Sequence, residues 1–310
     1  MTGRISVVVP VYNSKEFLPE LYERLIAVLE REGQDFEIIF VDDGSKDESW
    51  SVIKELAIED QRLRGFRLTR NYGQHNALFA GCNQATGDKI ITLDDDLQNP
   101  PEEIPLLLNK LSEGFELVYG IPVVRQHNLW RRLGSRVILV SLMTVLGFHS
   151  SWRVSSYRIF NATLVDSLRE NSRPRMSIDV LLSWATTEIS SCSVRHEARR
   201  SGKSTYSVFK LLSHAVDVIS GFSVLPLRCV ALLGVGFSFV GITMLSYILG
   251  RYVLQGSTVP GFPMLATMIC IFSGVQLFAV GVVGEYLGRL YEKSLGRPPY
   301  IVAESSDQDG

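Results

Sequence analysis

The stretch Leu93-Asp94-Asp95-Asp96-Leu97-Gln98 directly follows the apolar run Lys89-Ile90-Ile91-Thr92. Three adjacent aspartates repel one another, so their position at the end of a predicted strand indicates a compensating cation. In an extended backbone, Asp94, Asp96 and Gln98 would alternate onto one face. Three oxygen donors on one face suit Mg²⁺ or Mn²⁺, which retain waters and take substrate phosphates as further ligands. The alternative interpretation is a solvated acidic loop that caps a helix starting near Pro101.

On both sides of this stretch, strand patterns alternate with helix patterns. Strands are predicted over residues 5–11, 36–41, 64–69, 89–93 and 115–120, and helices over 15–31, 45–59, 74–85 and 101–113. Asn13 or Ser14 is the expected cap of the first helix, and Ser45-Lys46-Asp47-Glu48 is a capping box for the second. The alternation predicts an α/β fold, a mostly parallel sheet with helices on both faces.

Polar motifs follow several of these predicted strands. They are Tyr12-Asn13, Asp42-Asp43, Arg70-Asn71 and Asp94 to Gln98. Because parallel α/β sheets bind ligands beyond the carboxyl ends of their strands, these motifs are expected to form one site. A glycine-rich phosphate loop, which would have suggested a kinase or a dehydrogenase, follows none of the predicted strands.

Charge is distributed unevenly along the chain. The net charge of -2 gives no basic surface for nucleic acid. Residues 229–250 and 264–284 contain no charged side chain, and each run has about the twenty residues that cross a hydrocarbon core. The Gly- and Pro-containing link 252–263 predicts the turn of a helical hairpin. Two buried helices of a soluble protein are the alternative.

The predicted organisation has four parts. Residues 1–202 form a catalytic domain, 203–226 an amphipathic juxtamembrane helix, 227–290 two transmembrane helices, and 291–310 a cytoplasmic tail whose polar end, 304–310, is expected to be disordered. Residues 137–147 form either an interfacial helix or an ordinary core helix. No signal peptide is expected, since residues 1–4 lead straight into a strand. Basic residues such as Lys210, Arg228 and Arg289 flank the spans and place the domain and both termini in the cytoplasm.

Three motifs, taken together in order and spacing, resemble family-2 glycosyltransferases of the GT-A fold. They are Val9-Pro10-Val11-Tyr12-Asn13, Val41-Asp42-Asp43-Gly44-Ser45 and Leu93 to Gln98. The resemblance covers about the first two hundred residues. The Asp-x-Asp-x-Gln form, followed by Asn99-Pro100-Pro101-Glu102, resembles the polyprenyl-phosphate sugar transferases of the dolichol-phosphate mannose synthase branch. Ser156-Tyr157-Arg158 and residues 199–206 match later motifs of that branch more loosely.

The two C-terminal spans are similar to those of bacterial members of this branch. Those members use undecaprenyl phosphate and act in lipopolysaccharide glucosylation or aminoarabinose transfer in the cell envelope. Of these, the chain most resembles the polyisoprenyl-phosphate glucosyltransferases.

The resemblance implies roles for the motif residues. Nucleotide-sugar binding falls to Pro10, Tyr12, Asn13, Asp42, Asp43 and Asp95. Asp94 and Asp96 are the implied catalytic residues and, with Gln98, hold Mg²⁺ or Mn²⁺, which offsets charge on the leaving nucleoside diphosphate. A lipid phosphate is already an anion, so it needs no strong general base. His75, His127, His149, His196 and His214 are therefore expected to be surface or packing residues.

Bringing two phosphates together requires cations. The candidates for the acceptor phosphate are Arg125, Arg131, Arg132, Arg199, Arg200 and Lys203, with Ser135 adding a hydroxyl. Taken singly, each is also explained as a surface charge or a headgroup contact.

The predicted activity is metal-dependent, inverting transfer of a hexose, glucose from UDP-glucose, to polyprenyl phosphate at the cytoplasmic face of the inner membrane. Alternatives are transfer of an aminoarabinose derivative or mannose, and a non-catalytic membrane scaffold. A processive polysaccharide synthase lacks support because no Gln-x-x-Arg-Trp motif occurs. A lipid translocator lacks support, since two helices per chain are too few to enclose a path unless several chains assemble. Gly284 and Gly288 allow a homo-oligomer.

Overall fold

The structure is a computed structural model that describes residues 3–122, 154–165, 177–197, 225–255, 261–295 and 298–306. These residues fall into two compact units. One contains a sheet with its helices and residues 298–306, and the other contains two long helices. The helix predicted over 137–147 lies outside the described residues, as does the helix predicted over 203–226 apart from residues 225 and 226.

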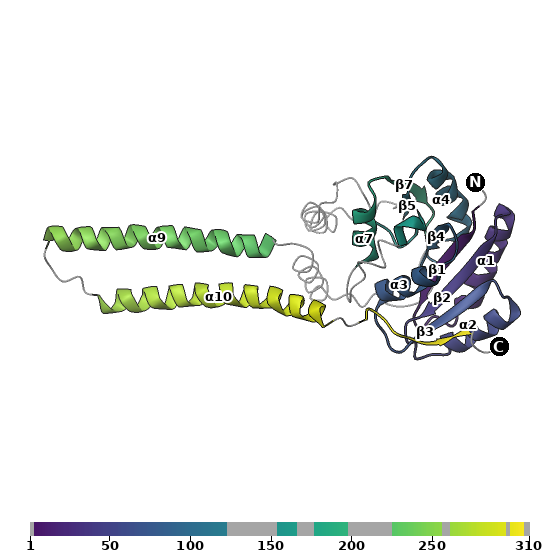
Figure 1. Ribbon diagram of the computed structural model, residues 1–310, viewed down its shortest axis with the longest axis horizontal. Coiled ribbons are helices and arrows are strands. Elements are labelled where there is room, and N and C mark those ends of the chain that lie inside the picture. Colours follow the sequence, from purple (N-terminus) through teal and green to yellow (C-terminus); the bar gives the residue numbers. More distant parts are fainter. Residues whose placement is uncertain are drawn as a thin grey trace. The chain divides into compact units, whose positions relative to one another are not determined.

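Within the described residues, eight strands form one sheet (Figure 1). The strands are β1 (Ile5–Val11), β2 (Phe36–Asp42), β3 (Leu63–Leu68), β4 (Lys89–Thr92), β5 (Leu117–Pro122), β6 (Arg158–Asn161), β7 (Ile189–Val194) and β8 (Val302–Ser305). Their order is β7-β5-β6-β4-β1-β2-β3-β8. β1 pairs in parallel with β2 and β4, β2 with β3, and β5 with β7, whereas β6 and β8 run antiparallel to their neighbours. The prediction of a mostly parallel sheet is confirmed.

Helices cover both faces of this sheet. They are α1 (Leu18–Glu32), α2 (Ser49–Glu59), α3 (Gln74–Gln84), α4 (Ile104–Ser112, entered through the 3-10 turn Pro101–Glu103) and α7 (Ile178–Ala185). Val7 and Val9 of β1 belong to the core cluster that contains Leu21 of α1. Val8 points the other way, toward α3, where a Cβ on Gly81 would lie 2.3 Å from its Cγ1. Alternate residues of one apolar strand therefore build two cores.

Two of the expected helix caps are wrong. α1 begins at Leu18 after Phe17, and α2 begins at Ser49 after Glu48, neither with a side-chain cap. The capping side chains are used elsewhere. Ser14 Oγ lies 2.5 Å from Asp95 Oδ2, and Ser45 Oγ accepts a hydrogen bond from the Asn13 amide at 3.0 Å. Local capping gives way here to contacts between loops at the carboxyl edge of the sheet.

The disorder expected for the polar end of the chain is also wrong for its described part. Residues 302–305 form β8, which pairs antiparallel with β3. Main-chain pairing along an exposed sheet edge requires no apolar run, so the polar composition was misleading.

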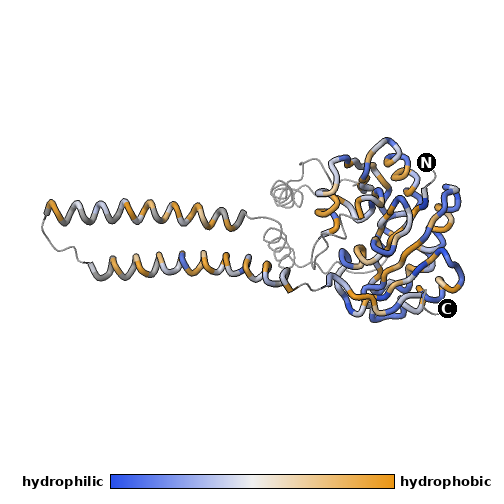
Figure 2. The backbone as a smooth tube through the Cα atoms, in the orientation of Figure 1, coloured by the Kyte–Doolittle hydropathy of each residue, from blue (hydrophilic) through white to orange (hydrophobic). Residues whose placement is uncertain are grey.

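The second unit contains α9 (Leu225–Gln255) and α10 (Phe262–Ser294), which run side by side (Figure 1). Many of their large apolar side chains are exposed, among them Leu254 at 85% and Val253 at 75%. Figure 2 shows that hydrophobic residues recur along both helices. In the part of the chain that is described, no helix meets both the length and the apolar character that crossing a membrane requires. The two predicted spans stay a prediction.

Candidate active site

The acidic stretch forms a turn, not an extended continuation of its strand. β4 ends at Thr92, and Leu97 has a positive φ of 60°. The argument from alternation along an extended strand is therefore wrong. Asp95 contacts the first loop, which connects β1 to α1. There it accepts hydrogen bonds from the Tyr12 amide at 3.0 Å and from Ser14 Oγ at 2.5 Å. Burial raises the pKa of Asp95 to about 6.

Asp94 is held by side chains alone in the contacts that the structure gives it. It accepts hydrogen bonds from Gln74 Nε2 at 2.6 Å, from Ser156 Oγ at 2.5 Å and from Asn99 Nδ2 at 3.5 Å. Burial raises the pKa of Asp94, and the nearby charge of Asp96 raises it further, although the Ser156 hydroxyl opposes both. Two carboxylates therefore stand close enough to feel each other's charge.

Asp96 and Gln98 contact each other. Gln98 donates its amide N–H to Asp96 at 3.2 Å and its Nε2 at 2.6 Å. No group of three or more His, Cys, Asp or Glu side chains that could hold a metal occurs among the described residues. Two carboxylates with an amide oxygen fit a hard ion such as Mg²⁺ or Mn²⁺ that completes its coordination with water or phosphate.

The motif that ends β2 is held mainly by the main chain. Asp42 Oδ1 accepts from the Ser45 amide at 3.0 Å, and the two oxygens of Asp43 accept from the amides of Tyr72 and Gly73 at 2.7 and 2.8 Å. Burial raises the pKa of both carboxyl groups. Gly44, between Asp43 and Ser45, has a φ of 67°, and a Cβ there would lie 2.6 Å from the backbone of Arg70. Only glycine fits at this position, where the backbone of one loop closely approaches the backbone of another.

The first loop joins these two motifs. Pro10 pairs with Val41 inside the sheet, and Tyr12 is 43% exposed. Asn13 adopts a positive φ of 54° and accepts a hydrogen bond from the Lys46 amide at 2.8 Å. Because the Tyr12 amide also binds Asp95, the structure brings all the predicted nucleotide-sugar residues to one edge of the sheet.

A cavity of about 350 Å³ opens beside Asp94. Its walls are Asp94, Gln98, Asn99, Ile121, Pro122, Val154, Ser155, Ser156 and His196. Sequence reasoning missed Ser156 and His196 as site residues, although Ser156 belongs to a quoted motif. For His196, the available signal was its position just beyond the end of β7.

A buried arginine supports the Ser156 side of this cavity. Arg158 is 1% exposed, donates from Nε to Thr92 Oγ1 at 3.0 Å and forms an ion pair with Asp179. Thr92 Oγ1 in turn donates to the Ser156 carbonyl at 2.8 Å. Ser156 is thereby tied to the strand that delivers Asp94.

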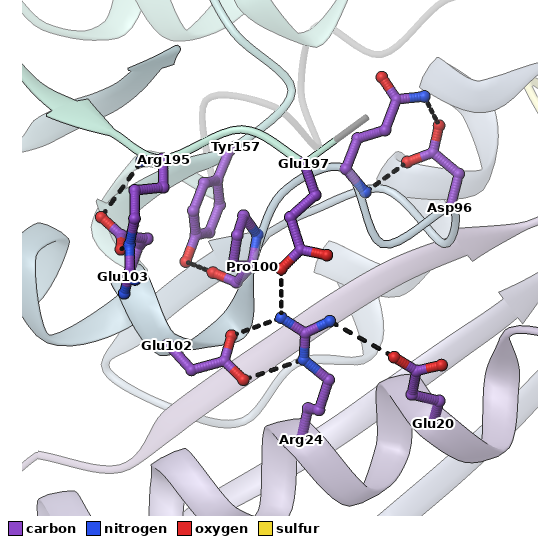
Figure 3. Close-up of polar contacts among 10 residues, drawn as sticks. Glu20, Arg24, Asp96, Pro100, Glu102, Glu103, Tyr157, Arg195 and Glu197 are labelled. Carbon is purple, nitrogen blue, oxygen red and sulfur yellow. Dashed lines mark hydrogen bonds and ion pairs between the residues drawn. The ribbon is translucent and has the colours of Figure 1, made fainter. Parts of the chain in front are cut away.

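A second arginine ties the acidic turn to the end of β7 (Figure 3). Arg24 of α1 binds Glu102 through two hydrogen bonds of 2.9 and 2.7 Å and Glu197 through one of 3.0 Å. The Glu197 amide donates to the Gln98 carbonyl at 3.0 Å. Nearby, Arg195 Nε donates to Glu103 at 2.5 Å. His196 therefore lies between Arg195 and Glu197, and hydrogen bonds hold both of these neighbours in place.

The residues predicted to bind the acceptor phosphate lie outside the described residues. They are Arg125, Arg131, Arg132, Ser135, Arg199, Arg200 and Lys203. The structure gives them no position, and their role stays a prediction.

Comparison with known proteins finds a family match over half of the chain. Residues 6–169 match the family described as Glycosyl transferase family 2. A protein from Enterobacter sp. (strain 638), described as undecaprenyl-phosphate 4-deoxy-4-formamido-L-arabinose transferase, is 35% identical over 96% of this chain and 92% of its own. A protein of the same description from Pseudomonas aeruginosa (strain LESB58) is 35% identical over 96% of this chain and 89% of its own.

Solved structures share the fold at lower identity. Glucosyl-3-phosphoglycerate synthase from Mycobacterium tuberculosis, in complex with Mn²⁺, UDP and phosphoglyceric acid, superposes with a TM-score of 0.51 at 20% identity, over 70% of this chain and 76% of that one. A mannosyltransferase from Pyrobaculum calidifontis, in complex with GDP-Man and Mn²⁺, superposes with a TM-score of 0.51 at 16% identity, over 93% and 88%. These likenesses establish the GT-A fold.

Proposed function

Because the chain belongs to glycosyl transferase family 2, we propose that it transfers a sugar from a nucleotide-sugar donor to undecaprenyl phosphate. The observation that carries this proposal is the position of Asp94 beside a cavity of about 350 Å³, at the sheet edge where the three motifs meet. The two relatives described above are 35% identical over nearly the whole chain, and their described acceptor is undecaprenyl phosphate.

The nucleotide is proposed to bind over the first loop and the β2 motif. Tyr12 presents an exposed ring, and Asp42 and Asp43 fix the two loops beside it through main-chain amides. An exposed aromatic next to rigid loops suits stacking against a base. The Mycobacterium tuberculosis neighbour holds UDP and the Pyrobaculum calidifontis neighbour holds GDP-Man, so either nucleotide is compatible with the fold.

Asp94, Asp96 and Gln98 are proposed to hold the divalent cation. When bound, the cation would offset the negative charge that develops on the leaving diphosphate. The protein's part is to present two carboxylates held mainly by side chains that can rotate away, those of Gln74, Ser156, Asn99 and Gln98. Asp96 also accepts a hydrogen bond from the Gln98 main-chain amide. Both neighbours described above contain Mn²⁺.

The acceptor phosphate is proposed to enter the cavity from the side of His196. The imidazole and the hydroxyls of Ser155 and Ser156 line this wall and can donate hydrogen bonds to phosphate or sugar oxygens. Ile121 and Val154 make part of the cavity apolar. Since the phosphate is already anionic, attack on the anomeric carbon with inversion needs no proton transfer.

Two sugars are proposed as candidates for transfer, glucose and a formamido-arabinose derivative. The sequence resemblance favours glucose from UDP-glucose, whereas the relatives described above are formamido-arabinose transferases. Identity of 35% over nearly the whole chain favours the arabinose derivative as the first sugar to test. Glucose is the second.

Attachment to a membrane is proposed to occur through α9 and α10. Exposed leucine, valine and phenylalanine side chains recur along both helices, and exposed apolar surface of this kind marks contact with a partner or a membrane. A lipid acceptor requires the catalytic domain to work at a bilayer, and the two charge-free runs lie within these helices. The proposed orientation keeps both termini on the cytoplasmic side.

The test is transfer of a labelled sugar by the purified full-length protein in detergent. Undecaprenyl phosphate is the acceptor, with UDP-glucose, the formamido-arabinose nucleotide and GDP-mannose supplied separately as donors. We expect lipid-linked product from one donor with Mn²⁺ or Mg²⁺ and none with EDTA or with Asp96→Asn. Product formed at full rate in EDTA would contradict the metal assignment, and no product from any donor would contradict the proposed activity.

A further inference from the structure

Strand β8 extends the sheet on the side of the nucleotide motifs. Arg67 of β3 pairs with Glu304 of β8 on one side and with Asp42 of β2 on the other. The Thr69 amide donates to the Ile301 carbonyl at 3.0 Å. The segment that follows α10 therefore lies one strand away from the motif that ends β2.

The Glu304 carboxylate is fixed by two side chains. Trp50 of α2 donates its indole N–H at 2.8 Å, and an Arg67 guanidinium nitrogen lies 3.3 Å from the other oxygen. Trp50 is 5% exposed, so its ring cannot turn to a different partner without disturbing the core. The indole N–H and Arg67 both lower the pKa of Glu304. Glu304 is thus a fixed anion beside Arg67.

Arg67 also compensates a buried carboxylate of the nucleotide motif. Its Nε lies 3.4 Å from Asp42 Oδ2. Asp42 is 0% exposed, and among the described residues its Oδ2 has no hydrogen-bond partner. A buried anionic oxygen without a hydrogen bond depends on the nearest cation, so the placement of Arg67 determines how Asp42 is held.

A second connection runs through the loop after β3. Thr69, whose amide binds the Ile301 carbonyl, also bonds to the Tyr72 hydroxyl through Oγ1 at 2.9 Å. The Tyr72 amide in turn donates to Asp43 at 2.7 Å. Two independent routes therefore link β8 to the adjacent residues Asp42 and Asp43.

We propose that Glu304 is a positioning residue for the nucleotide site, and that β8 helps to hold the residues of that site in place. Glu304 orients Arg67 against Asp42, and Ile301 fixes the loop that Asp43 caps. The inference rests on the proposed function, because it takes Asp42 and Asp43 as the residues that frame the donor nucleotide.

The test uses the full-length protein with Glu304→Gln, which keeps an acceptor for Trp50 and removes the charge next to Arg67. We expect the KM for the sugar nucleotide to rise about threefold to tenfold, while kcat and the KM for undecaprenyl phosphate stay unchanged. Arg67→Met should raise the donor KM at least as much, and the double variant should add nothing to it. Glu113→Gln, which removes an exposed carboxylate paired with Lys110 on α4, is the matched control and should leave all three constants unchanged.

Binding of UDP and GDP, measured by calorimetry with Mn²⁺, separates this inference from the transfer reaction. If the wild-type protein binds a nucleotide but transfers no sugar, the proposed function fails while the nucleotide affinity of Glu304→Gln still tests the inference. An unchanged nucleotide affinity in Glu304→Gln would overturn it, and so would wild-type protein that binds neither nucleotide. A lower melting temperature with a lower kcat and unchanged KM values would assign Glu304 to stability alone, which also overturns it.

Discussion

Two aspartate motifs end strands on either side of β1, and they are held in different ways. The motif after β2 is fixed by main-chain amides, those of Ser45, Tyr72 and Gly73. The motif after β4 is held mainly by side chains, those of Gln74, Ser156, Asn99 and Gln98. Asp42 and Asp43 are buried, whereas Asp94 and Asp96 are half-buried.

This difference indicates that the motif after β2 has a structural role and that the motif after β4 has a chemical one. A main-chain donor cannot leave its acceptor without moving the loop that carries it, so Asp42 and Asp43 fix the shape of the loops proposed to bind the nucleotide. A side-chain donor can rotate to a new partner at a small cost. Asp94 and Asp96 are therefore able to exchange their hydrogen bonds for a cation while the backbone stays in place.

The largest expected effect follows from removing one carboxylate of the side-chain-held motif. Asp96→Asn should lower the rate of sugar transfer by about a thousandfold or more, because the cation loses an anionic ligand. The melting temperature of the protein without metal should stay the same or rise, since one of two mutually repelling charges is removed. Transfer assays and thermal denaturation measure the two quantities. If Asp96→Asn failed to fold, Asp96 would have a structural role, which would contradict this prediction.

Asp43→Asn should show the opposite pattern. The amide group leaves one of two buried main-chain N–H groups without an acceptor, which costs about 1–3 kcal/mol of unfolding free energy. Chemical denaturation checks this value, and transfer should fall less than in Asp96→Asn. Unchanged stability with complete loss of transfer would contradict this prediction, because it would give Asp43 the chemical role assigned to Asp96.

Ser156→Ala should have a moderate effect on the metal site alone. Removing the hydroxyl deletes a short hydrogen bond to Asp94 and takes away an interaction that lowers the pKa of that carboxyl. We expect the concentration of Mn²⁺ giving half-maximal transfer to change by about threefold to tenfold, with little change in stability. Ser183→Ala on α7, whose hydroxyl donates to the Val180 carbonyl of its own helix at 2.7 Å, is the control. Equal responses in the two variants would contradict a role for Ser156 at Asp94.

The smallest effect is expected at a carboxylate remote from both motifs. Arg62, with help from Tyr22, lowers the pKa of Asp60 to about 2. A lowered pKa stabilises the fold above the unfolded value of about 3.9, and that contribution is lost as the pH falls toward 2. Asp60→Asn should therefore cost about 0.5–1 kcal/mol at pH 7, and the difference from wild type should vanish between pH 4 and pH 2. Denaturation at several pH values checks both statements, and transfer activity should be unchanged.

The sequence predicted the order of strands and helices from β1 to β5, because buried parallel strands produce long apolar runs, whereas β6, α7, β7 and β8 were not predicted. Ile5–Val11 is predicted and observed with the same bounds. Helix starts were predicted less well, because Ser14 and Ser45 bind partners that lie more than thirty positions away or on another loop. Such long-range contacts leave no local signal.

The site was predicted in its composition more than in its geometry. Asp94, Asp96 and Gln98 were chosen on the assumption of an extended strand, but Leu97 with its positive φ makes the segment a turn. His196 was expected to be a surface or packing residue and Glu304 to belong to a disordered end, because the roles of both residues depend on tertiary neighbours. Glu304 lies in a polar segment that gains its structure only by pairing with β3.

Mn²⁺ binding tests the contrast between the two motifs most directly. The purified full-length protein, Asp96→Asn and Asp43→Asn are titrated with Mn²⁺ by electron paramagnetic resonance, each at a UDP concentration that saturates it. We predict that wild type and Asp43→Asn bind one Mn²⁺ with similar affinity, and that Asp96→Asn loses this binding. Equal Mn²⁺ affinity in Asp96→Asn and wild type, or loss of binding in Asp43→Asn alone, would contradict the assignment of the metal to the side-chain-held motif.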